Sequence, residues 1–96
     1  MTRLEQLQER REEILAAAQE HGASNVRVFG SVARGTDDAQ SDIDFLVDLE
    51  SGRSLLDLSA LLLDLEDLLG ESVDVVTERG LRERIRPRVM AEALVL

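Results

Sequence analysis

The chain has 96 residues, and its 20 acidic and 11 basic side chains give a formal net charge of −9 at pH 7. This surplus of negative charge repels a phosphate backbone and therefore disfavours direct nucleic-acid binding. The absence of cysteine, tyrosine and tryptophan excludes disulfides, thiolate metal sites and the stacking of nucleotide bases on those two aromatic side chains.

The length predicts a single domain over residues 1–96. No apolar run is long enough to cross a bilayer, and the N-terminus has the pattern of a charged amphipathic helix rather than of a signal peptide. We therefore expect a cytoplasmic protein without a membrane partner.

The first predicted element is a helix that begins after Thr2 and runs to about His21. Thr2 and Glu5 form a capping-box pattern, and apolar residues recur on one helical face. Gly22 fits the left-handed position that follows a helix end. We interpret His21, the only histidine, as a structural residue of the helix C-terminus.

Two short apolar strands are predicted next, at residues 26–29 and 43–49. Asp42 and Asp44 open the second strand and point to the same face, because side chains alternate along a strand. Two carboxylates so close together repel each other and raise each other's pKa unless a cation lies between them. Since divalent cations such as Mg²⁺ prefer oxygen ligands, the pair predicts a metal site.

A Gly-Ser turn, Gly30 and Ser31, leaves the first strand, and ten residues separate it from Asp42. Its backbone N–H groups and its hydroxyl are suited to bind phosphate. The turn ends one strand and the aspartates open the next, so a shared site requires the two strands to be antiparallel. Either motif alone is a common structural feature; the spacing and the strand context favour a site.

The next predicted helix covers residues 54–69, with Ser54 and Asp57 as a capping box and Gly70 at its C-terminal end. Its leucines occupy well over half of the helix circumference, so the helix needs cover on two sides. The sheet can cover one side. A neighbouring helix is the first candidate for the other side, and a homo-oligomer or a partner through this helix is the alternative.

A third strand at residues 73–76 should lie parallel to the second, because a helical crossover joins them. Asp74 interrupts its apolar run. Burying a charge there costs several kcal/mol unless it is paired or bound to a metal, so Asp74 is the candidate third carboxylate. The predicted fold is α/β (α+β), a small mixed β-sheet flanked by helices.

Arg34 and Ser41 are candidate supporting residues. Arg34 could bind a triphosphate or hold Asp42, and pairing with Asp37 or Asp38 is an equally good structural explanation. Ser41 could cap or orient the aspartate that follows it.

A basic segment precedes the C-terminus, with five arginines in residues 79–88 ahead of an apolar end at residues 94–96. The simplest interpretation is a solvated helix face. Contact with an acidic partner or a nucleotide is the alternative.

Together the motifs resemble the nucleotidyltransferase superfamily of the DNA polymerase β type, whose signature is a Gly-Ser pair followed at this spacing by Asp-x-Asp. Residues 30–35 and 41–44, Gly-Ser-x-Ala-Arg-Gly and Ser-Asp-x-Asp, are similar to the minimal nucleotidyltransferases, small proteins often paired with a HEPN-domain partner. The superfamily places its third acid on the strand that carries Asp74 here. The resemblance covers nearly the whole chain, but only the two motifs are specific.

The resemblance implies a nucleotidyltransferase that moves AMP from ATP to a tyrosine hydroxyl of a HEPN-domain toxin and so acts as its antitoxin. The acceptor must lie on another molecule, because this chain has no tyrosine. The resemblance implies that Asp42, Asp44 and Asp74 bind two Mg²⁺ ions and are the catalytic residues. It also implies that the nucleotide is bound by Gly30, Ser31, Arg34 and Ser41.

Two other functions remain open. A non-catalytic antitoxin could mask its partner stoichiometrically, which the wide leucine helix and the acidic surface would suit. Nucleotidylation of a small molecule is disfavoured. The members of this superfamily that modify small molecules build the acceptor pocket with a second domain, whereas a single domain is predicted here.

Overall fold

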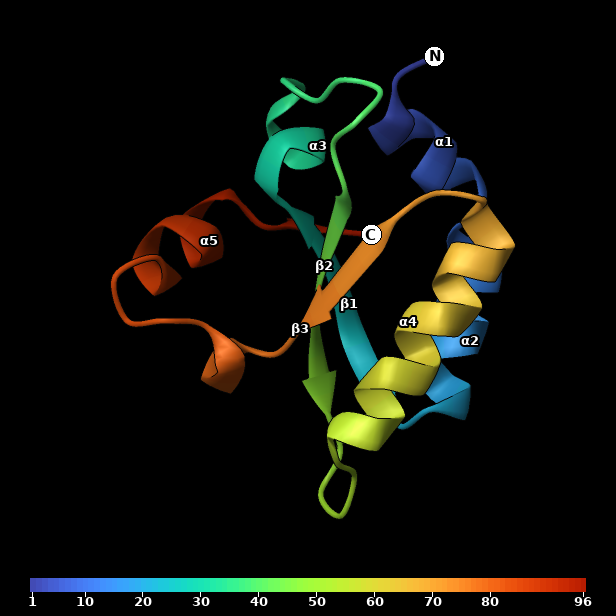
Figure 1. The fold of residues 1–96 in the computed structure, drawn as a ribbon, viewed down its shortest axis with the longest axis vertical. Coiled ribbons are helices and arrows are strands. Elements are labelled where there is room, and N and C mark those ends of the chain that lie inside the picture. Colours follow the sequence, from blue (N-terminus) through green and yellow to red (C-terminus); the bar gives the residue numbers. More distant parts are fainter.

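A four-stranded mixed sheet organises the protein in a computed structural model that describes residues 1–96 (Figure 1). In spatial order its strands are β3 (Val73–Val76), β2 (Ile43–Leu49), β1 (Ala23–Phe29) and β4 (Leu94–Val95). β1 and β2 are antiparallel, and β2 and β3 are parallel, as predicted. β4 was not predicted. It pairs antiparallel with β1 and forms the second edge of the sheet.

The helices lie on both faces of this sheet (Figure 1). They are α1 (Arg3–Glu9), α2 (Arg11–Glu20), α3 (Gly30–Arg34), α4 (Leu55–Leu69) and α5 (Arg86–Glu92), and a 3₁₀ turn, η1 (Glu78–Gly80), precedes α5. None of them combines the length and the apolar character that a membrane crossing requires.

The prediction of one continuous N-terminal helix was wrong, because the chain breaks at Arg10 between α1 and α2. Arg10 has φ −102° and ψ 18°, outside the helical range. Its guanidinium donates to the carbonyl of Leu68 at 2.6 Å and pairs with Glu13. The break therefore lies where the first helical segment is tied to the end of α4. Both predicted caps, at Thr2 and at Gly22, are present.

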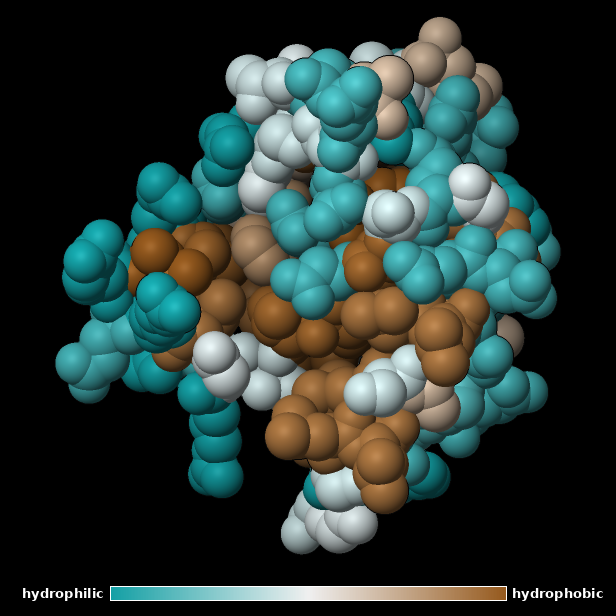
Figure 2. Space-filling model, viewed as in Figure 1, coloured by the Kyte–Doolittle hydropathy of each residue, from teal (hydrophilic) through white to brown (hydrophobic).

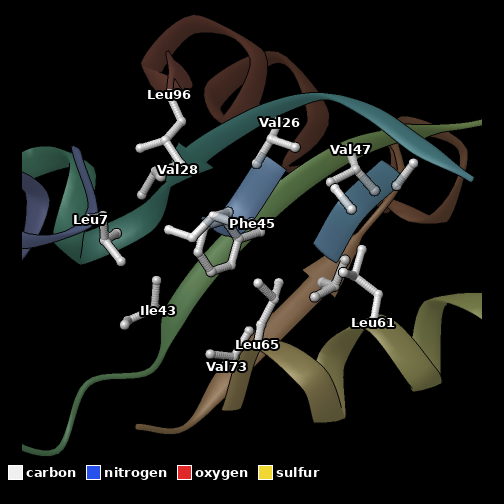
Figure 3. Close-up of a cluster of buried hydrophobic side chains, with 14 of the residues drawn as sticks. Leu7, Val26, Val28, Ile43, Phe45, Val47, Leu61, Leu65, Val73 and Leu96 are labelled. Carbon is white, nitrogen blue, oxygen red and sulfur yellow. The ribbon is translucent and has the colours of Figure 1, made fainter. Parts of the chain in front are cut away.

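The main core lies between one face of the sheet and the helices α1, α2 and α4. Figure 3 shows Phe45 of β2 at its centre, with Leu61 and Leu65 of α4 facing the sheet. Ile43, Phe45 and Val47 are each at most 1 % exposed, so alternate residues of β2 point into this core as predicted. Asp44 lies on the opposite face of the same strand.

α4 has the predicted bounds, with Ser54 and Asp57 as its capping box and Gly70 in the left-handed region at φ 70°. The sheet covers one side of α4, and α2 packs along another, so intramolecular packing satisfies most of the leucine pattern. The leucines that remain exposed are Leu55, Leu56 and Leu63.

The segment from η1 to α5 covers the other face of the sheet. Leu46 of β2, Leu81 and Val89 form a second, smaller buried cluster there. The arginines of residues 79–88 consequently lie on η1, on the turn after it and on α5. The prediction that these arginines share one helix face is therefore wrong.

Leu61 and Leu63 offer a matched test of the core, because both are leucines in the interior of α4. Leu61 is fully buried, whereas the side chain of Leu63 is 64 % exposed. Leu61→Ala should lower the free energy of unfolding by about 3 kcal/mol, through lost burial and the cavity it leaves. Leu63→Ala should change it by less than about 0.5 kcal/mol. Urea denaturation measures both, and equal losses would contradict this packing.

Candidate functional site

Strand pairing brings the three predicted elements of the site to one end of the sheet. Phe29, the last residue of β1, lies opposite Asp44 of β2. On the other side of β2, the parallel register places Asp74 of β3 beside Asp44. The Gly-Ser turn that follows Phe29 opens α3 at the same end (Figure 1). Residues far apart in the sequence are thus neighbours through the register alone.

Gly30 lies directly against Asp44. Its φ is +75°, a conformation that side chains other than that of glycine rarely adopt. A Cβ atom at this position would overlap Asp44 Oδ2, well inside van der Waals contact. The turn therefore needs glycine here both for its backbone conformation and for its close approach to the aspartate.

Negative charge accumulates around Asp44. Partial burial raises the pKa of its carboxyl to about 6, and the charges of Asp74 and Asp42 add to this effect. Arg34 acts in the opposite direction, and Glu92 raises the pKa further. An oxygen-rich site whose carboxylates repel one another is suited to a divalent cation.

Asp74 differs from its prediction in one respect. We expected a buried charge, but its side chain is exposed. The β2–β3 register, not burial, puts this carboxylate beside Asp44. The exposed position of Asp42, just before β2, leaves that carboxylate open to solvent as well.

The donor set of these three aspartates fits Mg²⁺ in its chemistry, because it consists of carboxylate oxygens alone. Their ligand atoms do not all lie within 4.8 Å of one another; the trio that does is Glu20, His21 and Asp64. In that trio His21 Nε2 lies 2.6 Å from Asp64 Oδ2. We interpret this contact as a tie between the end of α2 and α4, in line with the structural role predicted for His21.

Arg34 pairs with none of the carboxylates predicted for it, Asp42, Asp37 or Asp38. Its Nη1 donates to both carboxylate oxygens of Glu92, at 3.1 and 3.0 Å. Asp37, one of the expected partners, instead pairs with Arg3. The sequence could not indicate Glu92, which lies 58 residues away and reaches the site only because β4 pairs with β1.

Ser41 also has a different partner from the predicted one. Its hydroxyl bonds to Asp38, with Asp38 N donating to Ser41 Oγ at 3.0 Å, and makes no hydrogen bond to Asp42. Arg3 of α1, which sequence reasoning missed, donates to the carbonyls of Asp38 and Ser41, each at 2.9 Å, and pairs with Glu71. Arg3 and Ser41 thus hold the loop that leads to Asp42.

The raised pKa of Asp44 predicts that the metal-free protein loses stability as the pH rises from about 4 to about 6. The folded state binds the proton of this carboxyl more tightly than the unfolded chain, so the free energy of unfolding falls through this window. We expect a fall of about 1 kcal/mol, because water screens a partly exposed group.

Urea denaturation at about pH 4 and about pH 7 checks this effect. Asp57 and other carboxyls with lowered pKa values act in the opposite direction at lower pH. Comparing the wild type with Asp44→Asn cancels their contribution. A variant that loses as much stability as the wild type over this range would show that Asp44 is not the cause.

Comparisons with known proteins identify the family of the chain. A family model for the nucleotidyltransferase domain matches residues 9–96. A Methanocaldococcus jannaschii protein named as a candidate protein adenylyltransferase is 38% identical over 88 residues, 92% of this chain and 95% of its own length. The protein adenylyltransferase MntA of Thermococcus cleftensis is 41% identical over 73 residues, 76% of this chain and 74% of its own length.

Solved structures show the same fold. One, described as a candidate minimal nucleotidyltransferase, has a TM-score of 0.86 and 54% identity, and the match covers 100% of this chain and 97% of that one. A crystal structure of a toxin-antitoxin with AMP-PNP has a TM-score of 0.74 at 22% identity, over 88% of this chain and 69% of that one. At that identity the second likeness concerns the fold alone.

Proposed function

As a member of the nucleotidyltransferase domain family, this chain is a nucleotidyltransferase, and we propose that it transfers AMP from ATP to a tyrosine hydroxyl of a HEPN-type toxin. By this modification it would act as the antitoxin. The observation that carries the proposal is the strand register that places Asp44 beside Asp74 and against Gly30. The relatives named as protein adenylyltransferases support a protein as the acceptor.

The three aspartates are proposed to hold two Mg²⁺ ions, which would supply positive charge for the triphosphate and lower the pKa of the attacking hydroxyl. The N–H of Gly30 and the hydroxyl of Ser31 would bind phosphate oxygens, together with the guanidinium of Arg34. Ser41 would contribute indirectly, by holding the loop before Asp42.

The reaction we propose is an in-line displacement at the α-phosphorus. The acceptor hydroxyl gives its proton to the carboxylate of Asp74, and its oxygen bonds to the α-phosphorus. The bond from that phosphorus to the bridging oxygen breaks, and pyrophosphate leaves. Asp74 suits this role because its side chain is exposed, so an acceptor on another molecule can reach it.

An apolar surface on the same molecule suits a protein contact. Figure 2 shows apolar residues gathered where β3 and the N-terminal end of α4 lie. Leu55 and Leu56, at the start of α4, are 78 % and 81 % exposed. We propose this surface for the contact with a second copy or a partner, which was the alternative interpretation of the leucine pattern of residues 54–69.

Intact mass spectrometry of a protein that co-purifies with this chain tests the proposal. After incubation with Mg²⁺ and ATP, the partner should gain the mass of one or more AMP units. The same complex made with Asp42→Asn should show no gain. A tight complex whose mass never changes would instead favour an antitoxin that masks its partner.

A cell-protection assay separates the same two functions. Replacing Asp42 and Asp44 together by asparagine should leave the fold intact, because neither side chain contributes to the apolar core, and co-purification checks that the partner complex still forms. Cells that are still protected from the toxin by this double variant would exclude adenylylation as the basis of protection.

A further inference from the structure

Glu92, the last residue of α5, occupies the place where the proposed function requires a phosphate. Gly30 N–H donates to Glu92 Oε1 at 3.2 Å. Arg34 Nη1 donates to both oxygens of the same carboxylate, at 3.1 and 3.0 Å. One carboxylate thus accepts hydrogen bonds from two groups proposed to bind the nucleotide. A carboxylate and a phosphate compete for the same donors, because both are anions with several acceptor oxygens.

The fold holds Glu92 in this position. Val89, one turn earlier on α5, is 2 % exposed within the second buried cluster. Two residues after Glu92, Leu94 of β4 pairs with Val28 of β1. Anchored on both sides, the Glu92 side chain is only 16 % exposed. Packing therefore holds the Glu92 side of this contact, although the Arg34 side chain is 45 % exposed, so the pair differs from one between two freely rotating surface side chains.

The surrounding charges make this position costly for an acid. Asp44 and Asp74 already lie at this end of the sheet, and Arg34 is the cation that Glu92 pairs with there. A carboxylate next to other carboxylates is retained only if donors compensate for the repulsion. Gly30 N–H and Arg34 provide that compensation, so both donors are engaged before any nucleotide arrives.

We propose that Glu92 competes with the triphosphate for Gly30 N–H and Arg34, so that it sets the affinity of the site for nucleotides. The inference rests on the proposed function, which assigns these two donors to phosphate binding. When nucleotide binds, phosphate oxygens replace the Glu92 carboxylate on both donors, and Glu92 must turn away. Glu92 is then a regulatory residue of the site and takes no part in the transfer step.

The opposite role for Glu92 makes an opposite prediction. If Glu92 orients Arg34 toward the nucleotide, removing its charge should weaken binding. If Glu92 competes with the nucleotide, removing its charge should tighten binding. The sign of the change in Kd therefore decides between the two roles.

Isothermal titration calorimetry with Mg²⁺ measures the Kd of ATP and of inorganic triphosphate for the wild type and for Glu92→Gln. We expect the variant to bind both ligands about 10-fold more tightly, because a charge-assisted pair no longer has to be broken. Glu83→Gln is the matched control. Glu83 belongs to the same C-terminal segment, is exposed and forms no ion pair, so its loss should change Kd by less than about 2-fold.

The outcomes separate this inference from the proposed function. If the wild type transfers AMP but Glu92→Gln binds no more tightly, competition is wrong and the transfer stands. If neither protein transfers AMP but the variant binds triphosphate more tightly, the transfer is wrong and competition stands. A failure of both proteins to bind triphosphate overturns both.

Glu92→Asp provides a second measurement if the glutamine variant does not fold. It keeps the charge but shortens the side chain, so the hydrogen bonds to Gly30 N–H and Arg34 should be lost. Binding should tighten about 3-fold, less than in the glutamine variant because the negative charge remains. Thermal denaturation establishes that each variant is folded. An unchanged Kd in folded Glu92→Asp would overturn the proposal.

Discussion

Asp44→Asn should abolish AMP transfer while making the metal-free protein more stable. The carboxylate is a proposed metal ligand, and losing the charge stabilisation that a metal supplies should slow transfer by about 10²–10³-fold or more. In the metal-free protein the same charge is unfavourable, because burial and neighbouring acids raise the pKa of this group to about 6. The neutral amide removes that repulsion, which should add about 1 kcal/mol near neutral pH.

Thermal denaturation separates these two effects. Mg²⁺ with ATP should raise the Tm of the wild type by mass action, and by more than either ligand alone. Asp44→Asn should begin from a higher Tm and show no such rise. A ligand-dependent rise that survives in the variant would count against the assigned site.

Asp48→Asn is the matched control, because Asp48 lies on the same strand four residues further on. Its carboxylate pairs with the buried Arg27 at 2.8 Å. Removing that charge should lower stability by about 1 kcal/mol, since it leaves a buried cation less well compensated. Transfer should be unaffected. The two substitutions are chemically identical, so opposite changes in stability would show that environment determines the effect.

Local sequence signals predicted the elements that local interactions determine. Ser54 and Asp57 at one end of α4 and Gly70 at the other fixed its bounds, because capping uses residues within one turn of each other. The alternation of Ile43, Asp44 and Phe45 gave the two faces of β2 for the same reason. The antiparallel pairing of β1 and β2 followed from where the motifs had to meet, and the parallel pairing of β2 and β3 followed from the helical crossover between them.

Contacts between distant residues could not be predicted in this way. β4 has only two residues, and it exists because it pairs with β1. That pairing brings Glu92 to Gly30 and Arg34, so Arg34 has a partner that no nearby residue indicates. The exposure of Asp74 also depends on contacts between distant residues. An acid in an apolar run suggested burial, but β3 is an edge strand.

Gly30→Ala should cause a large loss of both stability and transfer, and Gly35→Ala should not. Both glycines have φ +75°, so each substitution places a side chain in a strained backbone conformation at a cost of about 1 kcal/mol. At Gly30 the new methyl group also overlaps Asp44 Oδ2, whereas at Gly35 no atom lies within 4 Å of the added Cβ. The overlap should add about 1–3 kcal/mol to the loss of stability.

Transfer assays and urea denaturation on the two variants isolate the contact between the turn and the aspartate. Because both glycines have the same φ, the difference between the variants measures mainly what the added methyl group does beside Asp44. A displacement of that carboxylate by about 1 Å should slow transfer about 100-fold in Gly30→Ala, with Gly35→Ala close to the wild type. Equal losses in both variants would mean that backbone conformation alone accounts for these glycines. A larger loss at Gly30 would show that the turn must approach Asp44 closely for the site to work.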